Sequence, residues 1–195
     1  MSNQARVGSG ASIWRFSIIQ DGAEIGSNTI IGSNVYIGSG VKIGSDCKIQ
    51  NGAQIFEGSI VGDGVFIGPG AILTNDKKPR AVTDQNKLKS KSDWKLTSVE
   101  ICNFASIGAG AICIAPIRIG EWALVGAGSV VTKSVGSFEY GFGNPYVKGG
   151  WIGKLGETLV QVDSSNFWLC PISKKLYGEI HNGGRILLIE VESLP

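Results

Sequence analysis

The stretch that decides the fold is IGSNTI IGSNVY IGSGVK IGSDCK, residues 25–48, in which a branched aliphatic residue opens every group of six. The same period extends in both directions and holds from residue 7 to residue 73. Its positions are Val7, Ile13, Ile19, Ile25, Ile31, Ile37, Ile43, Ile49, Ile55, Val61, Ile67 and Leu73. A fixed short period indicates one unit stacked on itself, and hexapeptide repeats are typical of a parallel β-helix.

The residue four places after each aliphatic from Val7 to Ile67 is small or β-branched. These residues are Ala11, Ser17, Ala23, Thr29, Val35, Val41, Cys47, Ala53, Ser59, Val65 and Ala71. Only such side chains fit where the chain turns a tight interior corner, and branched residues also suit short strands. Glycine is frequent directly after the aliphatic, where the backbone needs a permissive conformation.

A second block of the same repeat follows, out of phase with the first. Its positions are Ile101, Ile107, Cys113, Ile119, Val125 and Val131. We therefore predict a β-helix domain at residues 1–135, interrupted by an inserted loop at residues 74–100. A C-terminal extension is expected at residues 136–195, with short strands near Thr158–Val162, Trp168–Pro171 and Arg185–Val191. The loop is rich in lysine, and a long insertion in a compact repeat protein is usually functional or mobile.

Composition excludes several classes of function. The 195 residues carry a formal net charge of +2, which gives no general electrostatic reason to bind nucleic acid. No aliphatic run approaches the roughly 20 residues needed to span a bilayer. The first ten residues lack the apolar run of a signal peptide, so we expect a cytoplasmic protein without membrane attachment.

The cysteines and the histidine do not suggest a metal. None of the four cysteines forms a CxxC pair, and His181 is the only histidine. Cys47 occupies a small-residue position of the repeat and Cys113 an aliphatic one, so both are expected to be buried and inert. We therefore expect neither a metal nor a catalytic cysteine.

The repeat resembles that of the hexapeptide-repeat acyltransferases. Their fold is a left-handed parallel β-helix with three hexapeptides in each triangular coil, which would give four coils before the insertion and about two after it. On that count, two edges of the prism do not keep glycine after the aliphatic residue, and larger or polar side chains gather at and next to that position. Trp14, Arg15, Gln50 and Asn51 share one edge, and Glu57, Asn75 and Asp76 share the other. Consecutive coils lie about 4.8 Å apart, so Glu57 and Asn75 should be close neighbours.

Several further strings narrow the resemblance. They are IWRF at 13–16, IQN at 49–51, TNDKKPR at 74–80, GNP at 143–145, WIG at 151–153 and the CPxSxxY pattern at 170–177. With these strings, the chain resembles nucleotide-sugar N-acetyltransferases. Most similar is the group that acetylates the 3-amino group of UDP-2-acetamido-3-amino-2,3-dideoxy-glucuronate for O-antigen and related surface polysaccharides.

The resemblance implies roles for individual residues. Family members are homotrimers with acetyl-CoA in a groove between adjacent prisms, and the Asn of the TND string, here Asn75, lies at the reacting centre. The expected catalytic residues are Asn75, Asp76 and Arg15; Arg15 stands where the family often has a histidine. Expected substrate contacts are Trp14, Gln50, Asn51, Glu57 and Arg80. Expected acetyl-CoA contacts are Gly108, Gly126, Ala127, Lys133, Asn144 and Pro145.

The chemistry of the proposed reaction needs few special groups. A sugar amine is partly neutral near pH 7, so it can attack a thioester without a strong base, and catalysis rests mainly on positioning. Backbone N–H groups would stabilise the oxyanion. The fork of Arg15 suits the carboxylate of a uronate or a phosphate.

Two alternatives remain open. One is an N-acetyltransferase for a dTDP-3-amino-3,6-dideoxyhexose, because some members of that branch lack the first-coil histidine. The more remote one is a β-helix scaffold without catalytic activity. A γ-carbonic-anhydrase relative would need several histidines, and an O-acetyltransferase would normally need a histidine base; the single histidine disfavours both.

Overall fold

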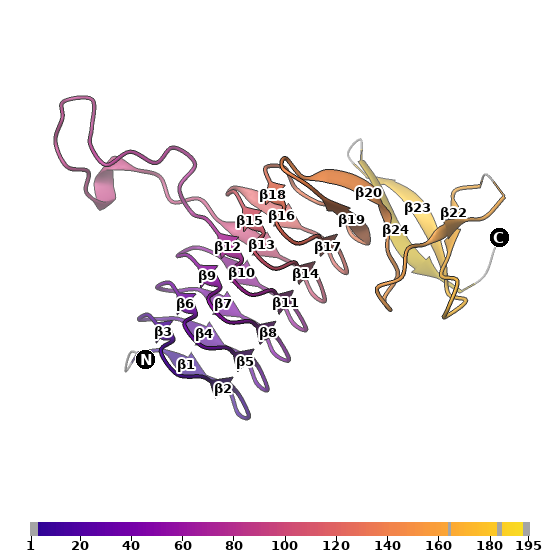
Figure 1. The fold of residues 1–195 in the computed structure, drawn as a ribbon, viewed down its shortest axis with the longest axis horizontal. Coiled ribbons are helices and arrows are strands. Elements are labelled where there is room, and N and C mark those ends of the chain that lie inside the picture. Colours follow the sequence, from indigo (N-terminus) through magenta and orange to yellow (C-terminus); the bar gives the residue numbers. More distant parts are fainter. Residues whose placement is uncertain (1–3, 164, 183–184, 193–195) are drawn as a thin grey trace.

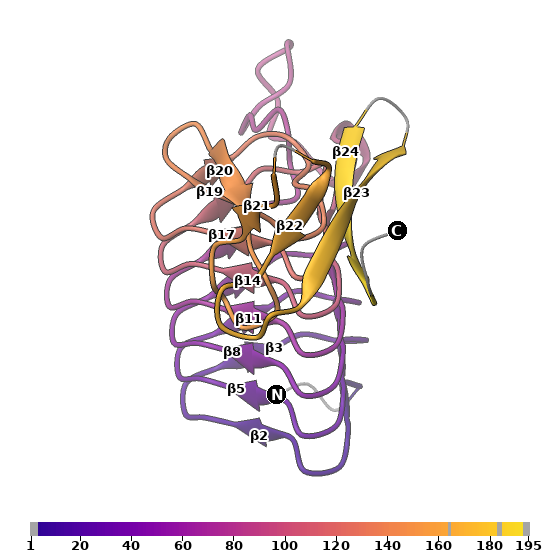
Figure 2. The ribbon, with the colours of Figure 1, turned by 90° about the vertical axis from the view of Figure 1, so that its right-hand side faces the viewer.

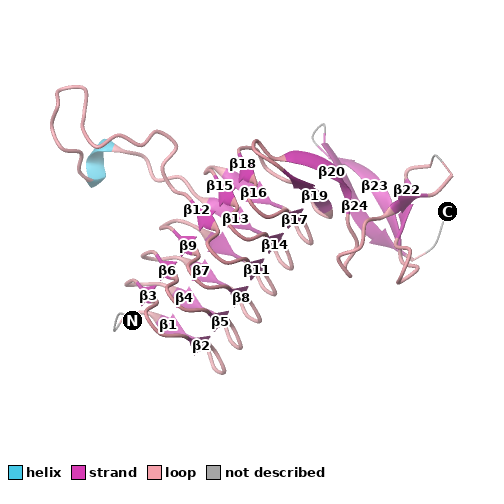
Figure 3. Cartoon of the chain, viewed as in Figure 1, coloured by secondary structure: helices cyan, strands magenta, loops and turns pink. Residues whose placement is uncertain are grey.

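The chain winds into a triangular prism with an arm projecting from its side and a separate antiparallel sheet at its C-terminal end (Figure 1). The computed structural model describes residues 4–163, 165–182 and 185–192. Within these residues the one helical element is a 3₁₀ turn in the arm, η1 (Lys91–Asp93), and all other regular structure is strand (Figure 3). The prediction of an all-β parallel helix is confirmed, and the architecture is consistent with the left-handed hexapeptide fold.

Three sheets form the walls of the prism. Sheet A contains β1 (Arg6–Val7), β4 (Glu24–Ile25), β7 (Lys42–Ile43), β10 (Ile60–Val61), β13 (Val99–Ile101) and β16 (Ile117–Ile119). Sheet B contains β2 (Ser12–Ile13), β5 (Ile30–Ile31), β8 (Lys48–Ile49), β11 (Phe66–Ile67), β14 (Ser106–Ile107), β17 (Leu124–Val125), β19 (Glu139–Phe142) and β20 (Val147–Trp151). Sheet C contains β3 (Ile18–Ile19), β6 (Tyr36–Ile37), β9 (Gln54–Ile55), β12 (Ile72–Leu73), β15 (Ile112–Cys113) and β18 (Val130–Val131).

The chain passes from sheet to sheet at three corners, here named the AB, BC and CA corners. In the second coil these are residues 26–29, 32–35 and 38–41. Figure 2 looks onto sheet B, whose strands lie one above another. Corresponding residues of consecutive coils therefore form columns along each corner, as the period predicts.

The core is a stack of the predicted aliphatics. Most hexapeptides supply a two-residue strand, and its second residue points inward; Ile31, Ile49 and Ile67, for example, are fully buried in sheet B. Val7, in the first coil, is 38% exposed because no coil lies beneath it. Dispersion and the removal of apolar surface from water thus stabilise every inner coil in the same way.

Hydroxyl groups in the small-residue positions bond to the neighbouring coil. Thr29 is fully buried, and its Oγ1 donates to the carbonyl of Gly44 at 2.8 Å and accepts the N–H of Cys47 at 3.1 Å. Ser17 makes the corresponding pair of bonds on the BC corner of the first coil. Its Oγ donates to the carbonyl of Gly32 and accepts the N–H of Val35. At Ser17 and Thr29 a hydroxyl is tolerated because both of its hydrogen-bonding functions are satisfied.

The arm is inserted into one corner of the prism. Strand β12 of sheet C ends at Leu73 in the fourth coil, and the next strand of the prism, β13 of sheet A, begins at Val99. The insertion therefore ends at Ser98 rather than at the predicted Glu100. The difference arises because Val99 and Glu100 already pair with sheet A neighbours. Ile101 lies beside Val61, 40 residues earlier, whereas regular coils are 18 residues apart, so the arm adds 22 residues.

Beyond residue 135 the chain extends the prism before leaving it. Strand β19 pairs with β17, so sheet B continues across the predicted boundary, and the division into two domains stays a prediction. The last sheet contains β21 (Val160–Gln161), β22 (Phe167–Leu169), β23 (Leu176–Asn182) and β24 (Arg185–Val191). Three of these four strands were expected; β23, which the tail motif and the following residues form, was missed.

Aromatic residues at the AB corner hold the last sheet on the prism. Phe104 and Trp122 stack with ring centroids 4.6 Å apart, and Phe138 packs edge-on against Tyr177 of β23 at 5.1 Å. Tyr177 is fully buried, in one cluster with Phe138 and Trp151. This small second core joins the extension to the last coils.

The outer surfaces of sheets A and C differ in chemistry. Sheet A carries ion pairs between neighbouring coils, such as Arg6 with Glu24 and Arg118 with Glu100. The outward residues of sheet C are mainly apolar, being Ile18, Tyr36, Gln54, Ile72, Ile112 and Val130. An apolar wall of this kind is typical of a surface that meets another protein.

Replacing one inward aliphatic should destabilise the prism far more than replacing an outward one. Ile67 is fully buried, whereas Ile60, in the same coil, is 51% exposed. We expect Ile67→Ala to lower the free energy of unfolding by about 2–5 kcal/mol, because it leaves a cavity. Ile60→Ala should change it by less than about 1 kcal/mol. Urea unfolding at matched protein concentration measures both, and equal losses would contradict the assigned inward and outward faces.

Candidate functional site

The arm leaves the prism at Asn75, the central residue of the expected site. Asn75 is half-buried, and its carbonyl accepts the N–H of Thr97 at 3.0 Å and the Oγ1 hydroxyl of Thr97 at 2.9 Å. The preceding Thr74 accepts the N–H of Ala115 on its hydroxyl at 3.0 Å. No hydrogen bond from the Asn75 side-chain amide occurs within the described ranges. The backbone is therefore fixed while the amide is available to a ligand.

Glu57 lies one coil below Asn75 on the CA corner. Ile55 pairs with Leu73, and each of the two polar residues follows its strand by two positions. The returning part of the arm passes close to this point, since a Cβ on Gly58 would lie 3.3 Å from the Leu96 side chain. The expected proximity of Glu57 and Asn75 thus follows from the register.

Asp76 helps to shape the arm. Its Oδ1 accepts the N–H of Lys78 at 2.8 Å, which is the hydrogen bond of an Asx turn. A second turn, at the end of the arm, forms where Thr83 donates to the carbonyl of Lys87 at 2.8 Å. Asp76 therefore has a local structural function in addition to its predicted role.

Two hollows lie along the arm on either side of Trp94. The larger, of about 630 Å³, is lined by Asn75, Asp76 and Arg80 together with Lys89, Lys91 and Trp94. Its three cationic side chains face one carboxylate, so it favours an anionic ligand. The smaller, of about 360 Å³, adds Lys77, Lys78, Lys95 and Thr97. The structure thus brings Asn75, Asp76 and Arg80 together around one cationic hollow.

The first-coil residues lie on a different corner. Trp14, which is 54% exposed, and Arg15, also exposed, begin the BC corner. Gln50 and Asn51 lie on the same corner two coils higher. Asn51 accepts the N–H of Ser33 on its Oδ1 at 2.8 Å, so part of its hydrogen-bonding capacity stabilises the stack. Sheet C separates this group from Asn75 within one chain.

Most of the expected acetyl-CoA contacts lie at the upper end of the BC corner. A Cβ on Gly108 would lie 2.4 Å from the Ala127 nitrogen, and one on Gly126 would lie 2.8 Å from the Phe142 Cβ. Both glycines are therefore required by the close approach of the next coil. Asn144 and Pro145 follow directly, in the turn between β19 and β20. Contact of these residues with acetyl-CoA stays a prediction.

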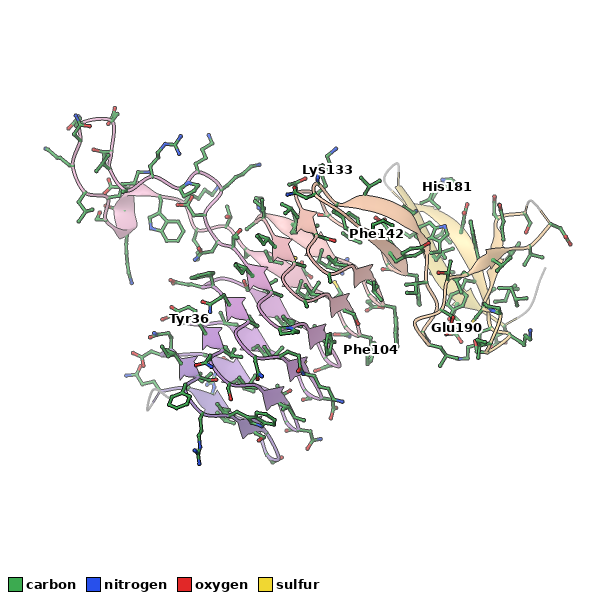
Figure 4. All side chains as sticks on the ribbon, in the orientation of Figure 1. Tyr36, Phe104, Lys133, Phe142, His181 and Glu190 are labelled. Carbon is green, nitrogen blue, oxygen red and sulfur yellow. The ribbon has the colours of Figure 1, made fainter. Side chains whose placement is uncertain are left out.

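Lys133 does not lie with this group. It follows β18 on the CA corner, two coils above Asn75, which is about 10 Å along the prism. Figure 4 shows Lys133 on the opposite edge of the prism from Phe104. The predicted contacts are thus divided between the BC and CA corners.

No specific role was predicted for four residues at this site. Lys89, Lys91 and Trp94 line the larger hollow, and Thr97 bonds to Asn75. One available signal was Trp94, a single aromatic residue in a polar, lysine-rich segment. The contact of Thr97 had no signal because it joins residues 22 positions apart across an aperiodic loop.

Neither the cysteines nor His181 lines the two hollows of the arm. All four thiols are free and buried, and burial raises the pKa of Cys113 to about 12. His181 is exposed on β23. Within residues 4–163, 165–182 and 185–192, no group of His, Cys, Asp or Glu is arranged to hold a metal ion, and no helix is long and apolar enough to cross a membrane.

Two family models match the repeats. The bacterial transferase hexapeptide model (six repeats) matches residues 4–39 and 40–75. The model of the hexapeptide repeat of succinyl-transferase matches residues 22–57 and 105–133. The chain belongs to the hexapeptide-repeat family. Both blocks of the hexapeptide-repeat prism are thus recognised, and the arm lies between them.

Similarity to individual proteins is more limited. The chain is 38% identical over 66 residues to the dTDP-3-amino-3,6-dideoxy-alpha-D-galactopyranose 3-N-acetyltransferase of Aneurinibacillus thermoaerophilus. This match covers 34% of each protein, so the chain spans about a third of the length of that relative. Such a short match establishes the repeat and leaves the activity to be argued from the site.

Two crystal structures share the fold. AntD, an N-acyltransferase from Bacillus cereus crystallised with dTDP-4-amino-4,6-dideoxyglucose and coenzyme A, superposes with a TM-score of 0.63 at 24% identity, over 73% of this chain and 81% of that chain. PerB from Caulobacter crescentus, crystallised with CoA and GDP-perosamine, gives a TM-score of 0.59 at 21% identity, over 74% of this chain and 58% of that chain. At these identities the likeness concerns the fold.

The core thiols Cys47 and Cys113 should be inert in the folded protein, because burial raises the pKa of both. The thiolate is the reactive form, and a pKa of about 12 leaves Cys113 almost wholly protonated at pH 8. We expect an aromatic disulfide reagent to label Cys47 and Cys113 in the native protein at pH 8 at least about a hundredfold more slowly than in the urea-unfolded protein, as measured by mass spectrometry of the labelled peptides. Rapid labelling of either native thiol would contradict its assignment to the core.

Proposed function

We propose that this hexapeptide-repeat protein transfers an acetyl group from acetyl-CoA to the amino group of a sugar linked to a nucleoside diphosphate. The observation that carries the proposal is the pairing of the unengaged Asn75 amide with the cationic hollow of the arm. An amide can orient an amine, and Arg80, Lys89 and Lys91 can hold a diphosphate. The named relatives, which act on or bind amino sugars linked to nucleotides, support the same class of acceptor.

The reaction needs positioning more than acid–base chemistry. The amine nitrogen bonds to the thioester carbonyl carbon, the carbon–sulfur bond breaks, and the proton lost by nitrogen balances the departing CoA thiolate. Asn75 accepts a hydrogen bond from the amine and orients its lone pair. Backbone N–H groups of the coils stabilise the oxyanion. Glu57, one coil below Asn75 in the register, and Asp76, the next residue in the chain, are the candidates to receive the proton.

The first candidate acceptor is UDP-2-acetamido-3-amino-2,3-dideoxy-glucuronate, for surface polysaccharide synthesis. Arg15 supports it, because this exposed cation makes no ion pair in the described part of the chain and can meet a uronate carboxylate. The second candidate is a dTDP-3-amino-3,6-dideoxyhexose. It is favoured by the sequence match to the Aneurinibacillus enzyme. The cytoplasmic location belongs to the same proposal.

The active protein is proposed to be a homotrimer. The apolar outer surface of sheet C lies between the BC and CA corners, and these corners carry the two halves of the expected site. If three copies bury this surface around one axis, the BC corner of one prism meets the CA corner of the next. That association brings Trp14, Gln50 and Gly108 toward the Asn75 and Lys133 of a neighbouring copy.

Acetyl-CoA then lies between two prisms. Gly108, Gly126 and Ala127 supply backbone contacts from one side, and the turn at Asn144 and Pro145 closes that end of the groove. The neighbouring copy contributes its own Lys133 to the phosphates of CoA. This arrangement explains why the predicted contacts occur on two corners of a single chain.

The activity is tested by thiol release from acetyl-CoA with a panel of 3-amino nucleotide sugars. Asn75→Ala should lower kcat about a hundredfold, because it removes a group that acts in the transition state. Asn103→Ala is the matched control: its Oδ1 accepts the Asp63 N–H at 3.0 Å on the AB corner, away from the proposed site, so kcat should be kept. Arg15→Gln should raise KM for a uronate and leave KM for a 6-deoxy sugar unchanged.

The panel has clear outcomes. Release with the UDP-uronate supports the first acceptor, and release only with the dTDP sugar supports the second. No release with any amine would overturn the enzymatic proposal in favour of a scaffold.

Association through sheet C is tested by the molar mass of two variants of one coil. Ile112 faces outward from β15 in sheet C, and Ser106 faces outward from β14 in sheet B; both are half-buried. Ile112→Glu should reduce the mass measured by light scattering to that of a monomer, because an unpaired charge would be buried. Ser106→Glu should leave a trimer. Equal masses for the two variants would reject sheet C as the interface.

A further inference from the structure

The carbonyl of Asn75 has an unusual pair of donors from one residue. Thr97 donates both its backbone N–H, at 3.0 Å, and its Oγ1 hydroxyl, at 2.9 Å. A carbonyl oxygen has two lone pairs, so Thr97 uses its full accepting capacity. Thr97 is itself half-buried, which protects these bonds from water.

The repeat explains why these two residues meet. The arm adds 22 residues to a coil, and Asn75 and Thr97 are separated by 22 positions. Both therefore occupy the position that Glu57 holds in the coil below. Asn75 is the last residue in register before the arm, and Thr97 is the residue at which the register resumes.

The preceding residue is held by the coil above. The Thr74 N–H donates to the carbonyl of Cys113 at 3.0 Å, and the Thr74 hydroxyl accepts the N–H of Ala115 at 3.0 Å. The chain at Thr74 and Asn75 is thus bonded to the prism on one side and to the returning arm on the other. Among the residues that the structure describes, only Thr97 donates hydrogen bonds to the carbonyl of Asn75.

The side-chain amides of Asn51 and Asn75 differ in their hydrogen bonds. The Oδ1 of Asn51 is occupied by the Ser33 N–H, whereas the Asn75 amide makes no hydrogen bond within the described ranges. The site therefore combines a fixed backbone with an unoccupied side chain. This combination is expected where an amide must meet a ligand in one orientation.

We propose that Thr97 is a positioning residue for Asn75, and that its hydroxyl holds the Asn75 backbone in the conformation from which the side-chain amide reaches the acceptor amine. The inference rests on the proposed function, in which Asn75 contacts the acceptor. Thr97 itself touches neither the sugar nor acetyl-CoA in this arrangement. Its effect is confined to the orientation of the Asn75 peptide.

The test compares two substitutions of Thr97. Thr97→Val keeps the shape and the backbone donor and removes only the hydroxyl; we expect kcat to fall about tenfold, with KM for acetyl-CoA within about twofold of wild type. Thr97→Ser restores the hydroxyl and should keep kcat within about threefold. Thr29→Val is the matched control, because it deletes a hydroxyl of the same bonding type in the second coil. It should lower the melting temperature and preserve kcat.

Hydrogen–deuterium exchange separates this inference from the proposed function. In Thr97→Val, peptides covering residues 74–76 and 95–98 should exchange faster than in wild type, whatever the activity, while Thr29→Val should leave them unchanged. Unchanged exchange, an unchanged kcat in Thr97→Val, or an equal loss of kcat in Thr97→Ser would each overturn the role of the hydroxyl. Inactivity of the wild type toward every amine, with faster exchange in Thr97→Val, would instead reject the proposed function alone.

Discussion

The whole structure depends on the distance between coils. Parallel strands must lie about 4.8 Å apart to form hydrogen bonds, and this spacing leaves no room for a side chain at many corner positions. A Cβ on Gly108 would lie 2.4 Å from the next coil, and one on Gly26 would meet Gly44 at the same distance. The repeat of inward aliphatics and corner glycines follows from this one dimension.

Chemistry in this protein is consequently restricted to corners and to the arm. The walls consist of two-residue strands whose inner residues fill the core. The BC corner carries Trp14 and Arg15, and the CA corner carries Glu57 and Asn75. Because sheet C lies between them, the two halves of the proposed site do not face each other within one chain. The apolar outer surface of sheet C gives a physical reason for copies of the chain to associate and complete the proposed site.

The sequence predicted the repeated part of the structure well, for a physical reason. An aliphatic residue at an inward position of the repeat, such as Ile49 or Val125, is buried in the structure. Because each coil contacts only its neighbours, the local sequence pattern is enough to predict this part of the fold. The position of Glu57 beside Asn75 on the CA corner was predicted in the same way, because the two residues are one coil of three hexapeptides apart. The arm could not be predicted in this way, because the contacts of Trp94 and Thr97 depend on a loop without a period. The extension was predicted in part, and β23 was missed because its polar and aromatic residues do not alternate clearly.

The way the arm joins the prism lets the sequence of the loop change independently of the strands. Asn75 and Thr97 occupy one position of the repeat, so the coils above and below the arm stack as if a single corner residue lay between them. The length and sequence of the loop can therefore change without altering the register of any strand. The prism can act as a constant frame, and the loop as an exchangeable part in which preference for a particular acceptor can evolve.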